Sequence, residues 1–191
     1  MIGFYFDQNR CLGCKTCVVA CKDQNDLPVG VQFRYVSDFE VGQYPNARGF
    51  HYAGTCNHCK RPACVASCPT GAMYKNEEDG AVLHDDNACI GCESCVHSCP
   101  YGVPQLRNDL GIVQKCDSCA ALRAEGVNPR CVDACAMRAL DFGELSDLEK
   151  RYGAGLIRDL PFLPTSGETD PSLLINAKEA ALSPEAQGAP Q

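Results

Sequence analysis

The chain has 191 residues, enough for one domain or two small ones, and 16 of these residues are cysteines. Cysteine usage this high is typical of disulfide scaffolds and of proteins with metal or cluster sites. The formal net charge of −7 argues against a nucleic-acid partner. The sequence contains no uninterrupted apolar run of roughly eighteen residues, so no direct membrane span is expected.

The first residues lack the features of a secretory signal peptide. Residues 1–7 contain no basic start, no long apolar run and no small-residue cleavage site. We therefore expect synthesis in the cytoplasm, where thiols stay reduced and can bind clusters instead of forming disulfides.

The cysteines fall into four groups of four, and the first group follows a short strand expected over residues 2–6. Gly13 lies between its first two cysteines, where a tight loop brings backbone N–H groups close to sulfur. Residues 18–20 suit a helical turn. Residues 22–55 contain no cysteine and are expected to be an insertion that ends in a strand over residues 49–54. Group I consists of Cys11, Cys14, Cys17 and Cys21.

Groups II and III each end on a proline and are each followed by a predicted β-hairpin. Group III has the C-x2-C-x2-C-x3-C-P spacing of bacterial ferredoxins, whereas group II has two extra residues between its second and third cysteines. The hairpins are expected over residues 72–84 and 104–114, where turn residues separate short apolar runs. Group II consists of Cys56, Cys59, Cys64 and Cys68, and group III of Cys89, Cys92, Cys95 and Cys99.

Group IV contains a long loop between its second and third cysteines. A strand is expected after it over residues 138–143, followed by a helix over residues 146–152. The chain thus predicts a unit of cysteine loop, short helix and hairpin that is used four times. Group IV consists of Cys116, Cys119, Cys131 and Cys135.

Residues 161–191 are rich in Pro, Ser, Ala and Glu and contain no cysteine. Such a composition predicts a solvated, loosely ordered tail. The alternative is a docking arm for a partner, because the apolar residues 173–175 need an apolar surface to lie on.

Cysteine thiolates at these spacings are typical ligands of 4Fe-4S clusters. Three closely spaced thiols bind one side of a cluster, and in two-cluster ferredoxins the last cysteine of a run ligates the neighbouring cluster. Zinc is the main alternative, although the three close thiols of groups I and III would crowd one tetrahedral ion. A disulfide scaffold is the second alternative.

Basic side chains in the cysteine loops favour the reduced, more negative state of a cluster, unless they are simply solvated. These loop cations are Lys15, Lys60, Arg61, Arg123 and Arg130. The histidines are expected at the surface or beside the clusters, not as ligands; they are His51, His58, His84 and His97.

Seven motifs carry a family resemblance. They are Cys11-Leu-Gly-Cys-Lys-Thr-Cys through Ala20-Cys-Lys-Asp23, Cys56-Asn-His-Cys, Cys68-Pro-Thr-Gly-Ala-Met73, Cys89-Ile-Gly-Cys, Cys99-Pro-Tyr-Gly102, Lys115-Cys-Asp117 and Arg138-Ala-Leu-Asp-Phe-Gly143. On these motifs the chain resembles the iron-sulfur electron-transfer subunits of the DMSO reductase family of molybdopterin oxidoreductases, most of all those that serve DMSO reductase. The resemblance covers roughly residues 4–143. One departure is Ala136, which follows Cys135 where relatives commonly have proline.

The resemblance implies an α+β fold of two interleaved ferredoxin-like halves, each with two 4Fe-4S clusters and with short strands and helices. The outer half comprises residues 1–55 and 104–160, with groups I and IV and the insertion 22–55. The inner half comprises residues 56–103, with groups II and III. An extended C-terminal tail, a possible docking arm, comprises residues 161–191.

The resemblance also implies four 4Fe-4S clusters, each bound by three cysteines of one group and one cysteine of the paired group. Set 1 is Cys11, Cys14, Cys17 and Cys135; set 2 is Cys56, Cys59, Cys64 and Cys99; set 3 is Cys89, Cys92, Cys95 and Cys68; set 4 is Cys116, Cys119, Cys131 and Cys21.

By the same resemblance the chain is expected to be a non-catalytic electron-transfer subunit of an anaerobic respiratory complex. It would relay electrons between an integral membrane anchor subunit that oxidises quinol and a molybdopterin catalytic subunit. Co-export with a twin-arginine partner would place the peripheral, membrane-associated complex on the outer face of the cytoplasmic membrane; a cytoplasmic location is the alternative.

Two further functions stay open. The first is the same relay role in a formate dehydrogenase, hydrogenase, thiosulfate or polysulfide reductase, or dehydroxylase complex. The second, from a different class, is a zinc-stabilised interaction module, which metal analysis would distinguish.

Overall fold

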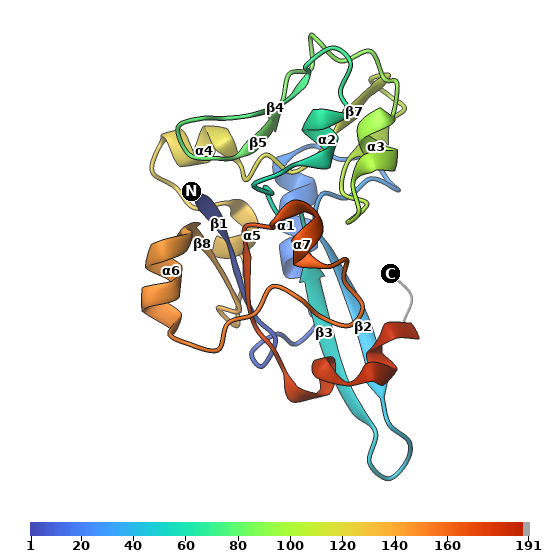
Figure 1. The fold of residues 1–191 in the computed structure, drawn as a ribbon, viewed down its shortest axis with the longest axis vertical. Coiled ribbons are helices and arrows are strands. Elements are labelled where there is room, and N and C mark those ends of the chain that lie inside the picture. The colour runs from blue at the N-terminus through green and yellow to red at the C-terminus, as the bar shows by residue number, and fades with distance from the viewer. Residues whose placement is uncertain (189–191) are drawn as a thin grey trace.

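The computed structural model describes residues 1–188 and centres on a three-stranded sheet with strand order β8-β1-β9 (Figure 1). The central strand β1, Ile2–Asp7, is buried along its whole length, as its almost continuously apolar sequence favours. It pairs antiparallel with β8, Leu140–Glu144, and parallel with β9, Leu173–Asn176. The sheet therefore joins the first residues of the chain to two segments near its other end.

The other strands form three separate antiparallel hairpins. Figure 1 shows β2–β3 as a long projection at one end of the molecule, with the other two hairpins, α2 and α3 at the opposite end. The hairpins follow groups I, II and III, whereas group IV is followed by β8, so the predicted unit is complete only three times. Their strands are β2 Tyr35–Val41 with β3 Arg48–Gly54, β4 Met73–Lys75 with β5 Val82–His84, and β6 Gln105–Arg107 with β7 Ile112–Gln114.

The helices are short, and four of them carry cysteines. α1 packs against α5, and α2 packs against α3. Lys15 and Glu93 adopt left-handed backbone conformations with φ of 61° and 58°, and each turns a cysteine loop into the helix that follows. The helices are α1 Thr16–Gln24, α2 Ala63–Ala66, α3 Ser94–Ser98, α4 Ala120–Ala124, α5 Arg130–Asp133, α6 Leu145–Tyr152 and α7 Ser166–Thr169, with 3-10 helices at Glu179–Leu182 and Pro184–Gly188.

Two apolar cores surround the cysteine groups. The larger core joins the central sheet, the β2–β3 hairpin and α1, and includes Phe4, Phe50 and Ile175. The smaller core lies around α2 and α3 and includes Val113 of β7 and the partly buried Leu106 of β6. The β6–β7 hairpin therefore packs with groups II and III, whereas the family resemblance implied that residues 104–114 belong to the outer half.

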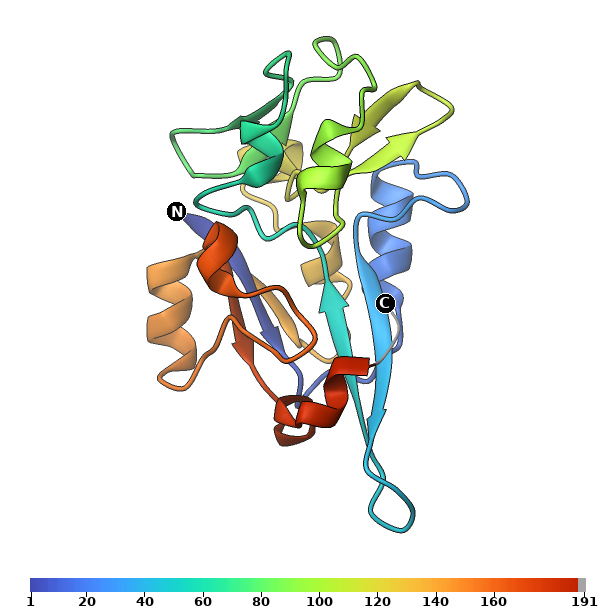
Figure 2. The same cartoon turned by 45° about the vertical axis from the view of Figure 1, so that its right-hand side comes forward.

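The segment 161–188 folds back onto the rest of the chain, so the prediction of a loosely ordered tail is wrong for these residues. Figure 2 shows β9 (red) beside β1 (dark blue), and all three residues of the apolar run 173–175 are at most 5% exposed. The apolar run is buried because it supplies an outer strand of the central sheet. Residues 189–191 of the predicted tail lie outside the described residues.

Within residues 1–188, none of the helices combines the length and the apolar character needed to span a bilayer.

Candidate cluster sites

All sixteen cysteines lie in the part of the chain that the structure describes, and all are free thiols. They come from loops and short helices, not from strands, because a loop followed by a helical turn can present three sulfurs to one point.

The four thiols of set 1 line one cavity with about 350 Å³ of open space. Cys17 lies in the first turn of α1 and Cys135 follows α5, and these two helices pack together. Phe6 and Leu140 of the central sheet form an apolar wall. The Ala139 N–H donates to Cys135 Sγ at 3.2 Å, a bond that stabilises negative charge on sulfur.

The four thiols of set 3 line a second cavity, with about 280 Å³ of open space, next to α3. Backbone N–H groups again donate to sulfur, from Met73 to Cys68 Sγ at 3.4 Å and from Val113 to Cys89 Sγ at 3.5 Å. Burial alone would raise the pKa of Cys68, but hydrogen bonds from Met73, Thr70 and Ala72 outweigh burial and hold this pKa below its usual value. The cavity therefore favours a thiolate at Cys68.

The thiols of set 2 lie close together beside α2. Burial, followed by the negative charge of Cys56, raises the pKa of Cys64 from 9.0 to about 12. Cys99 and Cys59 act on Cys64 in the same direction, so the other three members of the set all act on this thiol. A cation or a cluster iron is needed to keep such a group of thiolates charged.

The thiols of set 4 form the most buried group. Burial, followed by the charge of Cys131, raises the pKa of Cys21 from 9.0 to about 12, and Cys119 adds to this effect. Burial also raises the pKa of Cys116 well above its usual value, with Cys21 as the next cause. The Ser118 N–H donates to Cys116 Sγ at 3.3 Å.

Electrostatic effects between thiols of different sets, together with two packed helices, indicate the order of the sets. The pKa of Cys17 in set 1 is raised mainly by burial but also by Cys131 of set 4, and that of Cys116 in set 4 is raised also by Cys56 of set 2. Sets 2 and 3 share the packed helices α2 and α3, each of which runs from a cysteine of one set to a cysteine of the other. The order along the molecule is therefore set 1, set 4, set 2, set 3.

Only the two terminal sets have exposed cysteines. Cys14 of set 1 and Cys92 of set 3 are exposed, whereas every cysteine of sets 2 and 4 is buried or half-buried. An exposed apolar side chain accompanies each, since Leu12 is 63% and Ile90 66% exposed. Sets 1 and 3 are thus the two places where the row of thiols meets the surface.

Within residues 1–188, unpartnered buried nitrogens near the thiols are a second observation, besides the thiol sets, that fits iron-sulfur clusters. Four buried side-chain nitrogens lack a hydrogen-bond partner, and they belong to Arg34, His58 and His84. Arg34 lies among thiols of sets 1 and 4, His58 belongs to the loop of group II, and His84 lines the cavity of set 3. The two Arg34 nitrogens are donors, and so is His58 Nε2, because His58 Nδ1 accepts from the Val82 N–H. Donors without partners beside thiols suit the sulfur atoms of a cluster. His84 is different, since its Nδ1 bonds to the Asp86 carboxylate, which leaves Nε2 of the neutral ring as an acceptor. No three Cys, His, Asp or Glu side chains of residues 1–188 are grouped closely enough for a single metal ion.

The loop cations that the sequence singled out lie mostly at or near the surface, and most are paired with carboxylates. Lys15 forms an ion pair with Asp38 at 3.1 Å, and Arg123 forms one with Asp79 at 2.7 Å. Lys60 and Arg61 lie near Asp170, whereas Arg130 donates to the side chain of Gln24. The sequence did not indicate the buried Arg34, which lies in the cysteine-free insertion and follows no recognisable pattern.

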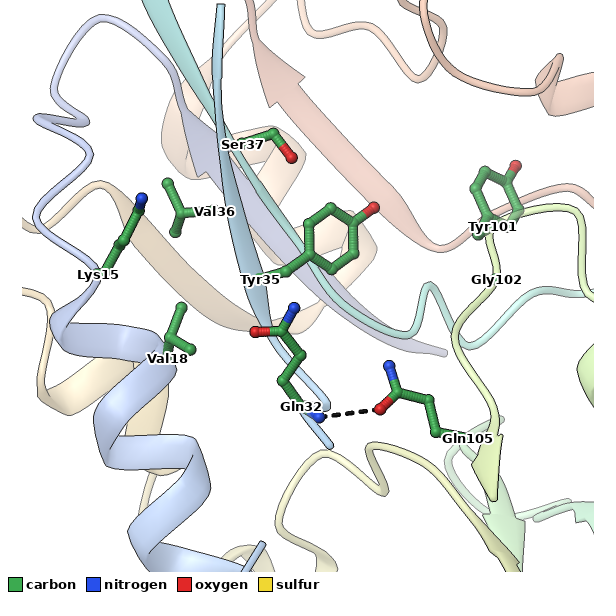
Figure 3. A pocket seen from close by; sticks show the side chains of 9 residues that line it. All are labelled: Lys15, Val18, Gln32, Tyr35, Val36, Ser37, Tyr101, Gly102 and Gln105. Carbon is green, nitrogen blue, oxygen red and sulfur yellow. Dashed lines mark hydrogen bonds between the residues drawn. The ribbon is translucent and has the colours of Figure 1, made fainter. Parts of the chain in front are cut away.

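A polar pocket with about 840 Å³ of open space lies apart from the four sets, between α1, β2 and the loop after group III. Figure 3 shows Lys15 on one side and Tyr35 and Tyr101 on the other, with the Gln32 backbone N–H donating to Gln105 Oε1 at 2.9 Å. Its lining residues include no cysteine, histidine or carboxylate. This pocket therefore provides neither a cluster ligand nor a nucleophile with a general base.

Comparisons with known proteins identify 4Fe-4S domains in the chain. The 4Fe-4S dicluster domain family matches residues 48–145, and the 4Fe-4S binding domain family matches residues 8–29. The protein is 43% identical to the B subunit of anaerobic dimethyl sulfoxide reductase from Escherichia coli (strain K12) over 181 residues, which cover 91% of this protein and 87% of that relative. The protein belongs to the family of DMSO reductase iron-sulfur subunits.

Other relatives widen this family. The corresponding B subunit from Haemophilus influenzae is 42% identical, and the match covers 97% of this protein and 94% of that relative. The thiosulfate reductase electron transfer subunit of Salmonella typhi is 42% identical, and the match covers 78% of this protein and 79% of that relative. As a member of the DMSO reductase iron-sulfur subunit family, the protein is an electron-transfer subunit with 4Fe-4S clusters, and its relatives are subunits of oxidoreductase complexes.

Proposed function

We propose that the protein carries four 4Fe-4S clusters, one in each thiol set, and is itself non-catalytic. Each cluster supplies one-electron redox chemistry when bound. The protein's own residues hold the clusters in line, exclude water from sets 2 and 4, and donate N–H groups to cysteine sulfur.

The observation that carries this proposal is the order of the sets together with their exposure. Two buried sets lie between two sets that reach the surface, each with an exposed cysteine. An electron can enter such a row at one exposed end and leave at the other. A single redox centre, or a structural zinc site, would need neither a row nor two exposed ends.

We further propose that the two exposed ends meet different subunits, one a molybdopterin catalytic subunit and the other an integral membrane anchor that oxidises quinol. The exposed Leu12 and Ile90 offer apolar contacts at these ends.

The complex would lie on the outer face of the cytoplasmic membrane after co-export with a twin-arginine partner. A molybdopterin subunit with a twin-arginine signal, encoded beside this protein, would support export, and its absence would favour a cytoplasmic complex.

The identity of the complex has one specific alternative. Similarity to a thiosulfate reductase electron transfer subunit supports a relay to a sulfur-reducing catalytic subunit instead of a DMSO reductase. Co-purification of the protein with its catalytic subunit, followed by an assay with both substrates, distinguishes the two.

The crossed ligand sets are tested by two matched substitutions. We expect Cys99→Ser to alter the cluster of Cys56, Cys59 and Cys64, and Cys68→Ser to alter the cluster of Cys89, Cys92 and Cys95. Electron paramagnetic resonance (EPR) of the reduced proteins reports which cluster changes. If each variant instead alters the cluster of its own group and leaves the other untouched, the crossed assignment is wrong.

A further inference from the structure

Arg34 is the most deeply buried cation among the described residues, 1% exposed, and it precedes strand β2 directly. Its Nη1 donates to the Ala53 carbonyl oxygen at 3.2 Å, and its Cζ lies 5.0 Å from the centre of the Phe4 ring. Its Nε and Nη2 have no hydrogen-bond partner in residues 1–188. Two N–H-bearing nitrogens of a charged group are therefore buried and unused.

The groups that act most strongly on the charge of Arg34 are cysteine thiols. Burial alone disfavours the charged guanidinium, but nearby thiolates outweigh burial and hold the pKa of Arg34 above its usual value. Three of these thiols belong to set 4 and one to set 1; they are Cys131, Cys17, Cys116 and Cys21. A buried charge without a carboxylate partner is costly, so its neutralising partner must be the group that these thiols hold.

A second buried cation, Lys115, provides a contrast. Its Nζ donates to the carbonyl oxygens of Val82 and Cys116 and thus has partners within the protein. Lys115 is therefore held by hydrogen bonds as a structural residue is. Arg34 has such a bond to the described residues only at Nη1. The free nitrogens distinguish Arg34 from Lys115.

We propose that Arg34 is the counter-charge of the set 4 cluster and raises the reduction potential of that cluster relative to its neighbours. The inference rests on the proposed clusters. Reduction adds one negative charge to a cluster, and a fixed positive charge at low dielectric stabilises the reduced state more than the oxidised one. Hydrogen bonds to cluster sulfur act in the same direction. Since set 4 lies between sets 1 and 2, Arg34 controls an internal step of the relay.

The test is a redox titration of the cluster-loaded protein, purified with the subunits that accompany it and followed by EPR. The variants are Arg34→Met and Arg34→Gln, which remove the charge, and Arg34→Lys, which keeps it. Arg48→Met is the matched control, because Arg48 is exposed, lies at the start of β3 and pairs with Glu179 at 3.5 Å. The set 4 signal is identified by its change in Cys119→Ser.

We expect the one-electron reduction constant of the set 4 cluster to fall at least tenfold in both neutral variants, equivalent to about 59 mV. Arg34→Lys should change it by less than about threefold, and Arg48→Met should leave all clusters unchanged. Loss of the set 4 cluster alone from the neutral variants, with its retention in Arg34→Lys, also supports a counter-charge.

Three results would overturn the inference. The first is that both neutral variants retain four clusters with unchanged reduction constants, a result that leaves the proposed function intact. Another is a shift confined to a different cluster. The third is loss of folding or of all clusters in Arg34→Lys as well as in the neutral variants, which would make Arg34 a structural residue. A wild-type protein without clusters would instead refute the proposed function itself.

Discussion

Truncation of Ile175 to alanine tests whether the C-terminal segment is an integral part of the fold. Ile175 is fully buried, pairs with Phe6 in the register of β9 and β1, and exchanges backbone hydrogen bonds of 2.8 and 3.0 Å with Ile157. Ile175→Ala removes three carbon groups, which cost roughly 0.8 kcal/mol each, or about 2.4 kcal/mol. The cavity left behind raises the expected loss of stability to about 3 kcal/mol.

Hydrogen exchange of the cluster-loaded protein, measured by mass spectrometry, reports this loss locally. A cost of about 3 kcal/mol corresponds to roughly hundredfold faster exchange in β1 and β9, provided that these amides exchange through opening of the sheet. Leu182→Ala is the control, because Leu182 lies in the same segment but is 51% exposed, so its truncation should cost less than about 0.5 kcal/mol. Equal effects of the two substitutions, or exchange in wild-type β9 as fast as in an unfolded peptide, would refute the structural reasoning.

Two more predictions follow from the thiols and the loops. Because burial, followed by neighbouring thiolates, raises the pKa of Cys21 and of Cys64 from 9.0 to about 12, the contribution of these two thiols to the stability of the cluster-free chain should be fully present below pH 9 and be lost as the pH rises towards 12. Circular dichroism measures this; stability that increases over that range would contradict it. Gly91→Ala should alter the EPR signal of set 3, because the added Cβ would clash with the Gly111 carbonyl oxygen. Gly102→Ala should leave this signal unchanged, because Gly102 also has a positive φ but faces open space. Similar signals in both variants would count against this steric argument.

Turn residues and short apolar runs were sufficient to predict several elements from the sequence. The strands near residues 2–6 and 49–54, both hairpins and the helix near residues 146–152 are present. Strand β2 was missed although its sequence contains a signal, because Phe39 and Val41 are buried while Asp38 and Glu40 between them are exposed. That alternation is the mark of a half-buried strand.

Long-range pairing could not be predicted in this way. β9 pairs with β1 across almost the whole chain, with Leu173 opposite Phe4. Residues 173–175 indicated only that some apolar surface must cover them. Which surface does so depends on the assembled sheet, not on any local pattern.

The spacing of the cysteines predicted more about the cluster sites than about the charged residues that surround them. Cysteine spacing and family resemblance indicated which thiols belong together, and the structure brings sets 1 and 3 around two cavities. The important cation was not predictable, because Arg34 reaches the thiols only through tertiary folding. Loop residues such as Lys15 and Arg123 drew attention by sequence position, yet both are paired with carboxylates.

Iron and acid-labile sulfide analysis of the anaerobically purified protein, with the EPR spin count after full reduction, tests the central claim most directly. Four 4Fe-4S clusters predict about sixteen iron atoms and about sixteen sulfides per protein molecule, with about four electrons taken up. A protein with stoichiometric zinc and no labile sulfide, or with iron for only one or two clusters after full reconstitution, would contradict a four-cluster relay.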